Sequence, residues 1–147
     1  MKRSEAAKSS LKKGFSCSQA VLSAFCGDFD LDHSKALKLA AGFGGGMGRM
    51  ALTCGAVTGA FMVLGLKHGG TVAEDLEAKE RTRQSVVEFV QRFKSLNGSI
   101  TCKDLLRCDL STSEGYDHAK KSGLIRILCP KFVGDAAEIL EEILSAR

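Results

Sequence analysis

Proline, the residue that most strongly breaks a helix, occurs only at Pro130 in this chain of 147 residues. β-Branched residues are few relative to Ala, Leu, Lys and Glu, and no segment alternates apolar and polar residues as a half-buried strand does. The hydrophobic fraction of 44% is enough for one continuous core. We therefore predict an all-α fold, a compact single-domain bundle of about six to seven helices, some of them short, over residues 1–147.

Capping residues and apolar spacing place these helices along the chain. Val86, Phe89, Val90 and Phe93 fall at i, i+3, i+4 and i+7, which predicts a helix with one face on the core. The expected helices are 4–13, 17–25, 32–41, an apolar central helix that starts at 54, 72–96, a short helix from 102, and 130–146. A polar loop is expected at 109–116, and a glycine-rich loop precedes the apolar helix.

The distribution of charge and hydrophobicity excludes several classes of protein. The formal net charge of +4 is spread along the chain among acidic residues, so no basic face for nucleic acid is expected. No apolar segment follows the basic N-terminus, so we expect no secretory signal and a cytoplasmic location. The most apolar run, 51–66, is short for a bilayer and contains Thr53, Cys54 and Thr58, which predicts a buried helix rather than a membrane span.

Six cysteines in a protein expected in the cytoplasm are available for redox or metal chemistry. Four of them occupy the N-cap or the first turn of an expected helix: Cys17, Cys54, Cys102 and Cys129. Ser16 and Gln19 have the spacing of a capping box, and Thr53 and Thr101 can cap the helices that follow them. Pro130 suits position N1, which makes the preceding cysteine an N-cap.

These positions have a chemical consequence, because a helix N-terminus carries a partial positive charge and unpaired N–H donors. Both stabilise a thiolate, the form of cysteine that attacks disulfides and binds metals. We therefore expect the four sulfurs to converge on one redox centre. Cys26, at an expected helix C-terminus, and Cys108, in an unassigned segment, are interpreted as bystanders. For any single cysteine, burial as a small apolar residue is the more common role.

The glycine-rich loop at 42–48 lies just before the apolar helix, and two further glycines lie within that helix. The loop matches neither G-x-G-x-x-G nor a Walker A sequence, and no strand precedes it, so we favour close backbone approach over phosphate binding. The glycines expected to let another backbone or a bound cofactor approach are Gly45, Gly46, Gly55 and Gly59. Arg49 follows the loop and could add positive charge near Cys54.

The cysteine positions and the CGAVTG segment at 54–59 resemble the C_GCAxxG_C_C family of redox-active proteins. Members are about this long and have four cysteines and a CGAxxG motif. The resemblance covers nearly the whole chain and assigns the family cysteines to Cys17, Cys54, Cys102 and Cys129. It implies a redox role for these residues and places Cys26 and Cys108 outside the pattern.

The resemblance also bears on cofactors and partners. The chain is similar to a helical region of split-Soret cytochromes, but their haem-binding C-x-x-C-H signature is absent, so no haem is expected. Family members are often encoded near transporter genes, which implies an association with a transport system. The redox partner stays open, and a homodimer through the small-residue face of the apolar helix is one alternative.

Several functions remain open for the four sulfurs. The first is an iron–sulfur cluster held by Cys17, Cys54, Cys102 and Cys129 for electron transfer, although no C-x-x-C pair is present. The second is metal-free thiol–disulfide exchange, in which Cys54 attacks and another of the four resolves. A structural zinc site on the same ligands and a transport-associated interaction protein are further alternatives. Whether the protein is an enzyme is left open.

Overall fold

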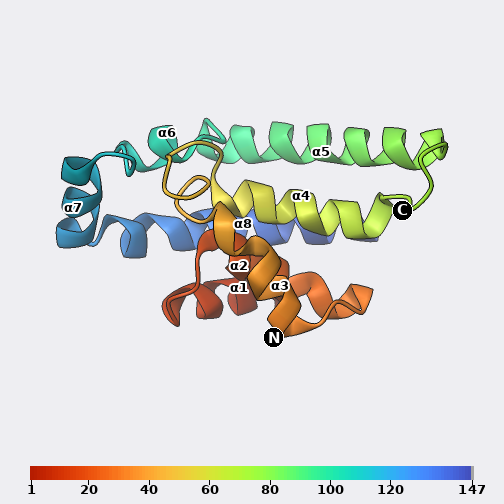
Figure 1. The fold of residues 1–147 in the computed structure, drawn as a ribbon, viewed down its shortest axis with the longest axis horizontal. Coiled ribbons are helices and arrows are strands. Elements are labelled where there is room, and N and C mark those ends of the chain that lie inside the picture. Colours follow the sequence, from red (N-terminus) through yellow and green to blue (C-terminus); the bar gives the residue numbers. More distant parts are fainter. Residues whose placement is uncertain (147) are drawn as a thin grey trace.

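The computed structural model describes residues 1–146, which fold into eight α-helices, two short 3₁₀ helices and no β-strand (Figure 1). The α-helices are α1 (Arg3–Lys12), α2 (Cys17–Phe25), α3 (His33–Ala40), α4 (Gly55–His68), α5 (Leu76–Asn97), α6 (Cys102–Leu106), α7 (Ser113–Ser122) and α8 (Leu124–Ser145). The 3₁₀ helices η1 (Cys26–Phe29) and η2 (Ala41–Phe43) flank α3. The all-α prediction is confirmed. None of these helices combines the length and hydrophobicity needed to cross a bilayer.

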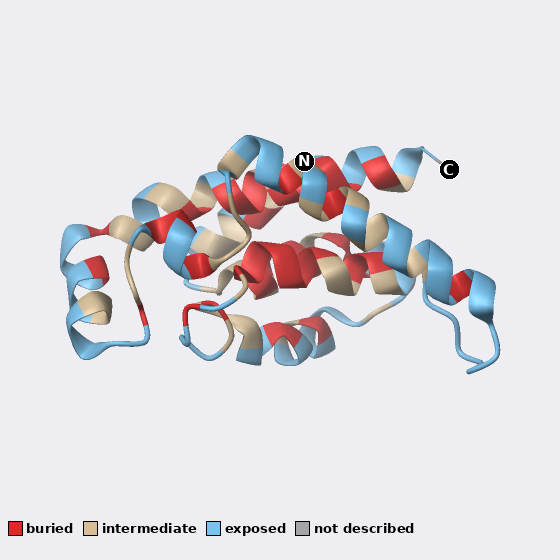
Figure 2. Cartoon of the chain, turned by 90° about the horizontal axis from the view of Figure 1, so that it is seen from above, coloured by how far each residue is buried: buried red, intermediate tan, exposed pale blue. Residues whose placement is uncertain are grey.

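Helix α4 is the centre of the molecule and packs against α2, α5 and α8. A helix that is apolar or small on every face is stable only when it is covered all round, and α4 is such a helix. Its buried residues are Gly55, Ala56, Val57, Thr58, Gly59, Ala60, Val63 and Leu64. Figure 2 shows how buried residues gather on the facing sides of the helices, while exposed residues form the outer surface.

A row of phenylalanines joins α4 to the two longest helices, α5 and α8. The rings of Phe61 and Phe89 meet edge to face with centroids 6.3 Å apart, and those of Phe89 and Phe93 stack at 5.8 Å. Phe93 then contacts Phe132 of α8 at 6.5 Å. Phe89 and Phe93 are fully buried, so the apolar face predicted for α5 is the face that packs on the core.

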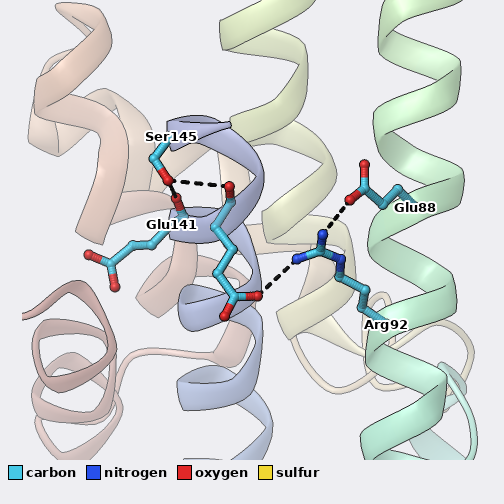
Figure 3. A network of polar contacts seen from close by, with 5 residues as sticks. Glu88, Arg92, Glu141 and Ser145 are labelled. Carbon is cyan, nitrogen blue, oxygen red and sulfur yellow. Dashed lines mark hydrogen bonds and ion pairs between the residues drawn. The ribbon is translucent and has the colours of Figure 1, made fainter. Parts of the chain in front are cut away.

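On the outer surface an arginine links α5 to α8 (Figure 3). Arg92 pairs with Glu88 of its own helix at 2.6 Å and with Glu142 of α8 at 2.8 Å. At the same place Ser145 donates a hydrogen bond to the carbonyl of Glu141 at 2.8 Å. The side chains of Arg92, Glu88 and Glu142 are 40–67% exposed, so each ion pair contributes about 1 kcal/mol or less to stability. The buried phenylalanines, rather than these charges, hold the two helices together.

Most predicted helix boundaries agree with the structure where a capping residue decides them. The predicted bounds of α2 match, and those of α1 and α3 differ by about one residue. The predicted start of α5 at 72 is wrong, because Asp75 is its N-cap and accepts a hydrogen bond from the N–H of Ala78 at 3.0 Å. Its end is as predicted, with Gly98 in the left-handed region at φ +85°.

Two predictions in the second half of the chain are wrong. The expected polar loop at 109–116 is partly helical, because Thr112 caps α7 by accepting a hydrogen bond from the N–H of Gly115 at 2.9 Å. The last helix begins at Leu124 rather than at Pro130, so the proline lies inside α8. Apolar side chains of the first turns of α8, including Leu124 and Leu128, pack on the core. This packing compensates for the hydrogen bond that proline cannot donate.

Candidate redox site

A pocket of about 550 Å³ brings together segments from distant parts of the sequence. All four cysteines singled out above line it: Cys17, Cys54, Cys102 and Cys129. They come from α2, the N-cap of α4, α6 and α8. Figure 1 shows the glycine-rich loop beside the beginnings of α4 and α6 at one end of the bundle, where it forms part of the pocket wall.

The first cysteine is fixed by the predicted capping box at the start of α2. The N–H of Ser16 donates to Oε1 of Gln19 at 3.0 Å, and the N–H of Gln19 donates back to Oγ of Ser16 at 3.5 Å. The side-chain amide of Gln19 also donates a hydrogen bond to the carbonyl of Leu37, which connects α2 to α3. Cys17 is therefore the first helical residue, and it lies half-buried at the pocket.

Cys54 and Cys102 are held together by a short backbone contact. An isolated antiparallel bridge joins Thr53 to Thr101, the residues that precede the two cysteines in the sequence. The N–H of Cys54 donates to the carbonyl of Ile100 at 2.7 Å, and the N–H of Cys102 donates to a carbonyl of the segment before α4 at 2.6 Å. Because successive side chains of an extended segment point to opposite faces, the residues that follow the bridge share one face. The bridge therefore directs both cysteines to the pocket.

Glycine in the loop before α4 permits the close approach of α6. Six residues of the glycine-rich loop and the segment that joins it to α4 have backbones in the left-handed region: Gly45, Gly46, Met47, Gly48, Arg49 and Ala51. A Cβ at Gly46 would lie 2.7 Å from the Cβ of Cys102 and 2.8 Å from the Cα of Ala51. Gly45 and Gly46 both line the pocket. Because Gly46 has no side chain, Cys102 can pack directly against its backbone.

The two glycines of the CGAVTG segment bring α4 against α2. A Cβ at Gly55 would lie 2.9 Å from the backbone nitrogen of Ser18 and 3.1 Å from the Cβ of Cys17. A Cβ at Gly59 would lie 2.9 Å from the carbonyl oxygen of Ser18. Gly55 lines the pocket, whereas Gly59 lies outside it and serves the helix contact alone. The close approach expected at Gly55 and Gly59 is therefore made by α2, the neighbouring helix.

The fourth cysteine is not at a helix start, which corrects its assignment as an N-cap. Cys129 is the sixth residue of α8, and Pro130 follows it within the same helix. Apolar residues before it, such as Ile125, pack on the core, so the helix begins well upstream of the proline. A weak sign was present in the sequence, because Ile125, Cys129, Phe132 and Ala136 follow helical spacing across the proline.

Burial, rather than the helix N-terminus, controls the acidity of two pocket thiols. Burial raises the pKa of Cys54 from its ordinary value of 9.0 to about 12, although the backbone N–H groups of Ala56 and Val57 act to lower it. Burial also raises the pKa of Cys102 to about 12, and the neighbouring Cys54 and Cys129 add to the rise. The expectation that helix starts stabilise thiolates at these positions is therefore wrong, because desolvation outweighs the favourable N–H groups.

Cys17 and Cys129 influence each other's acidity in opposite directions. The interaction with Cys129 raises the pKa of the Cys17 thiol well above its ordinary value. Burial and the neighbouring thiols raise it further. The interaction with Cys17 lowers the pKa of Cys129, in spite of the burial that opposes this shift. Among the four pocket sulfurs, Cys129 is the one whose thiolate the surroundings favour.

The sequence of residues 15–143 matches the model of the family described as "Putative redox-active protein (C_GCAxxG_C_C)". The chain belongs to the C_GCAxxG_C_C family. The matched region contains all four pocket cysteines and the glycine-rich loop, so the resemblance is confirmed over most of the chain. No curated protein and no solved structure matches this C_GCAxxG_C_C protein.

The remaining two cysteines of this C_GCAxxG_C_C protein lie outside the pocket lining. Cys26 is buried beyond the end of α2, and its S–H donates to the carbonyl of Ser23 at 3.5 Å. Cys108 follows α6, and its S–H donates to the carbonyl of Gly115 at 3.1 Å. Each of these thiols therefore donates to a backbone carbonyl and lies outside the set of cysteines that line the pocket.

The pocket also contains Tyr116, which sequence reasoning did not assign to a site, and Arg49, whose charge the sequence suggested near Cys54. The guanidinium carbon of Arg49 lies 3.9 Å from the centre of the Tyr116 ring. The tyrosine belongs to α7, in a segment that was expected to be a loop. Its contact with Arg49 depends on how α7 packs, so no local sequence pattern identifies it.

The fit of a metal to the four cysteines can be tested on their arrangement. All four line one pocket, which has the chemistry of a cluster site. However, no three His, Cys, Asp or Glu side chains among residues 1–146 are placed to hold a metal ion. In this arrangement the sulfurs are therefore not placed to ligate a single metal ion such as zinc.

Proposed function

We propose that this C_GCAxxG_C_C protein is a thiol–disulfide redox protein whose working pair is Cys17 and Cys129. The observation that supports the proposal is that these two cysteines line one pocket and interact there, which lowers the pKa of Cys129 and raises that of Cys17. A nucleophilic thiolate beside a protonated thiol is the arrangement that an attacking and a resolving cysteine require. Both residues line the pocket, which gives a small substrate access to them.

The chemistry of such a pair proceeds in two balanced steps. The Cys129 thiolate attacks one sulfur of a substrate disulfide, the substrate S–S bond breaks, and one half leaves as a thiolate. Cys17 then loses its proton and attacks the sulfur of Cys129, which releases the second half. The pair is oxidised to a disulfide, and the substrate gains two electrons and two protons. A second dithiol then resets the pair by the reverse exchange.

This assignment changes the role that the sequence suggested for Cys54. A pKa of about 12 leaves both Cys54 and Cys102 protonated near neutral pH, so neither is a ready nucleophile. Cys129 takes that role, because its interaction with Cys17 lowers the pKa of its thiol. The identity of the redox partner, a homodimer, an association with a transport system and a cytoplasmic location stay predictions.

The test is to map the disulfide formed when the reduced protein is oxidised anaerobically with a small disulfide. We expect the loss of two thiols, a linked peptide pair containing Cys17 and Cys129, and full reversal by dithiothreitol. Cys129→Ala should abolish this link. Cys26→Ala, which removes a buried cysteine outside the pocket, should leave it intact. A different linked pair in the wild-type protein, or six free thiols after oxidation, would contradict the proposal.

An iron–sulfur cluster is the second candidate, supported by the presence of four cysteines around one pocket of about 550 Å³. Because no three of these side chains are placed around a single metal ion, a cluster that spans the pocket is the form of metal centre that this candidate requires. Anaerobic reconstitution with iron and sulfide tests this candidate directly. Visible absorption with stoichiometric iron and sulfide, lost in each of the four Cys→Ala variants, would establish it in place of the exchange pair. Bound zinc that survives oxidant would indicate the structural alternative.

A further inference from the structure

The lining of the four-cysteine pocket contains a single permanent charge. Arg49 is the only Lys or Arg among the lining residues, and none of them is Asp, Glu or His. The remaining lining residues carry no formal charge, and most of them are apolar, glycine or cysteine. The guanidinium of Arg49 therefore determines which ligand charge the pocket favours.

Arg49 is held in place while its hydrogen-bonding groups stay unused. Its backbone lies in the left-handed region at φ +62°, and its N–H donates to the carbonyl of Gly44 at 3.1 Å. Its side chain rests on the ring of Tyr116 at 3.9 Å. Among residues 1–146 its guanidinium makes no hydrogen bond or ion pair, although five N–H groups are available. The protein thus presents an oriented cation at the pocket with no protein anion opposite it.

The size and burial of the pocket limit the ligand to a small molecule. Cys129 is only 6% exposed, and Cys54 and Cys102 are 6% exposed or less. A disulfide on the surface of a folded protein would have to enter the pocket to reach these sulfurs. The volume of about 550 Å³ lies within the range typical of small-molecule sites.

We propose that the pocket takes a low-molecular-weight disulfide that carries a carboxylate, with Arg49 binding the carboxylate while a ligand sulfur reaches Cys129. The planar guanidinium matches a carboxylate through two parallel hydrogen bonds, which fixes the orientation of the ligand as well as its charge. The inference rests on the proposed exchange function and adds the class of substrate. The exchange itself is unchanged: a bond forms from Cys129 to the ligand, and the ligand S–S bond breaks.

Three disulfides of similar size and different charge provide the test. They are 3,3′-dithiodipropionate, which is dianionic, bis(2-hydroxyethyl) disulfide, which is neutral, and cystamine, which is dicationic. The rate at which each oxidises the reduced protein is measured by thiol counting under anaerobic conditions. We expect the dianion to react about tenfold faster than the neutral disulfide, as one charge-assisted contact provides, and cystamine to be slowest. High salt should narrow the differences.

Variants then assign the preference to one residue. Arg49→Gln should bring the three rates close together, and Arg49→Lys should retain part of the preference. The matched control is Arg107→Gln, because Arg107 is also exposed with a left-handed backbone, at φ +52°, yet lies outside this pocket. It should leave the preference unchanged. Equal wild-type rates for the three charges, or a preference that survives Arg49→Gln, would overturn the inference.

A binding measurement without sulfur separates this inference from the proposed exchange. The chain has one tyrosine and no tryptophan, so tyrosine fluorescence reports on Tyr116 alone. Suberate, the carbon analogue of dithiodipropionate, should change this emission saturably, whereas 1,6-hexanediol should not, and Arg49→Gln should abolish the response. No response to suberate would refute the carboxylate site. A response to suberate with no oxidation by any disulfide would uphold the site and refute thiol exchange.

Discussion

Replacing Gly59 with alanine should destabilise the protein, although alanine is the better helix former. Gly59 lies inside α4, where it faces the backbone of α2. A Cβ at this position would lie 2.9 Å from the carbonyl oxygen of Ser18 and 3.1 Å from the Cβ of Val21. Both distances are shorter than ordinary contact, so α2 and α4 must separate to accommodate a methyl group.

The expected magnitude follows from two opposing effects. In a helix interior, glycine to alanine stabilises by about 1 kcal/mol, because glycine is the more flexible residue in the unfolded chain. Overpacking of a core contact costs about 1–3 kcal/mol, and a backbone oxygen cannot rotate away as a side chain can. Taking the upper end of that range, Gly59→Ala should lower the free energy of unfolding by about 2 kcal/mol.

Gly65 of the same helix provides the matched control. A Cβ at Gly65 would meet nothing within 4 Å, so Gly65→Ala should raise the free energy of unfolding by up to about 1 kcal/mol. Both variants are measured by denaturant unfolding, followed by helical circular dichroism at equal protein concentration. The two changes should have opposite signs. If Gly59→Ala stabilises the protein as much as Gly65→Ala does, the close contact between α2 and α4 is refuted.

Three further predictions test the construction of the site and the surface. Gly46→Ala should cost at least about 1 kcal/mol more than Gly48→Ala in denaturant unfolding, since both backbones are left-handed but only Gly46 faces other atoms. Because Cys54 and Cys102 keep their protons in the folded protein up to a pKa of about 12, the free energy of unfolding should fall as pH rises from 9 toward 12, and Cys54→Ala should reduce that slope. Arg92→Ala should lower the free energy of unfolding by about 1 kcal/mol or less, with a smaller effect at high salt.

Local signals in the sequence predict much of the fold. Ser16 and Gln19 form the capping box that their spacing indicates, and α2 begins at the following residue. Gly98 ends α5 in the left-handed conformation that glycine adopts most readily. All four cysteines that the sequence singles out line one pocket, and three of them belong to segments whose helix starts the sequence marks. These features depend on interactions within a few residues, which a sequence displays directly.

The rest of the site depends on tertiary packing, which local patterns do not encode. Pro130 suggested a helix start, but core contacts of the preceding turn extend α8 past it and place Cys129 within the helix. The pKa of Cys129 is lowered by Cys17, more than a hundred residues away in the sequence, and not by a helix end. Burial reverses the acidity expected for Cys54. The approach of Tyr116 to Arg49 likewise depends on the packing of α7.

The distance between the sulfurs of Cys17 and Cys129 tests the account most directly. It can be measured in crystals prepared anaerobically from reduced protein and then oxidised by a small disulfide. The account predicts two sulfurs in hydrogen-bonding contact in the reduced form and a bond of about 2.05 Å in the oxidised form, with Cys54 and Cys102 still as free thiols. Two sulfurs that stay apart in both forms, or a bond between Cys54 and Cys102 instead, would contradict it.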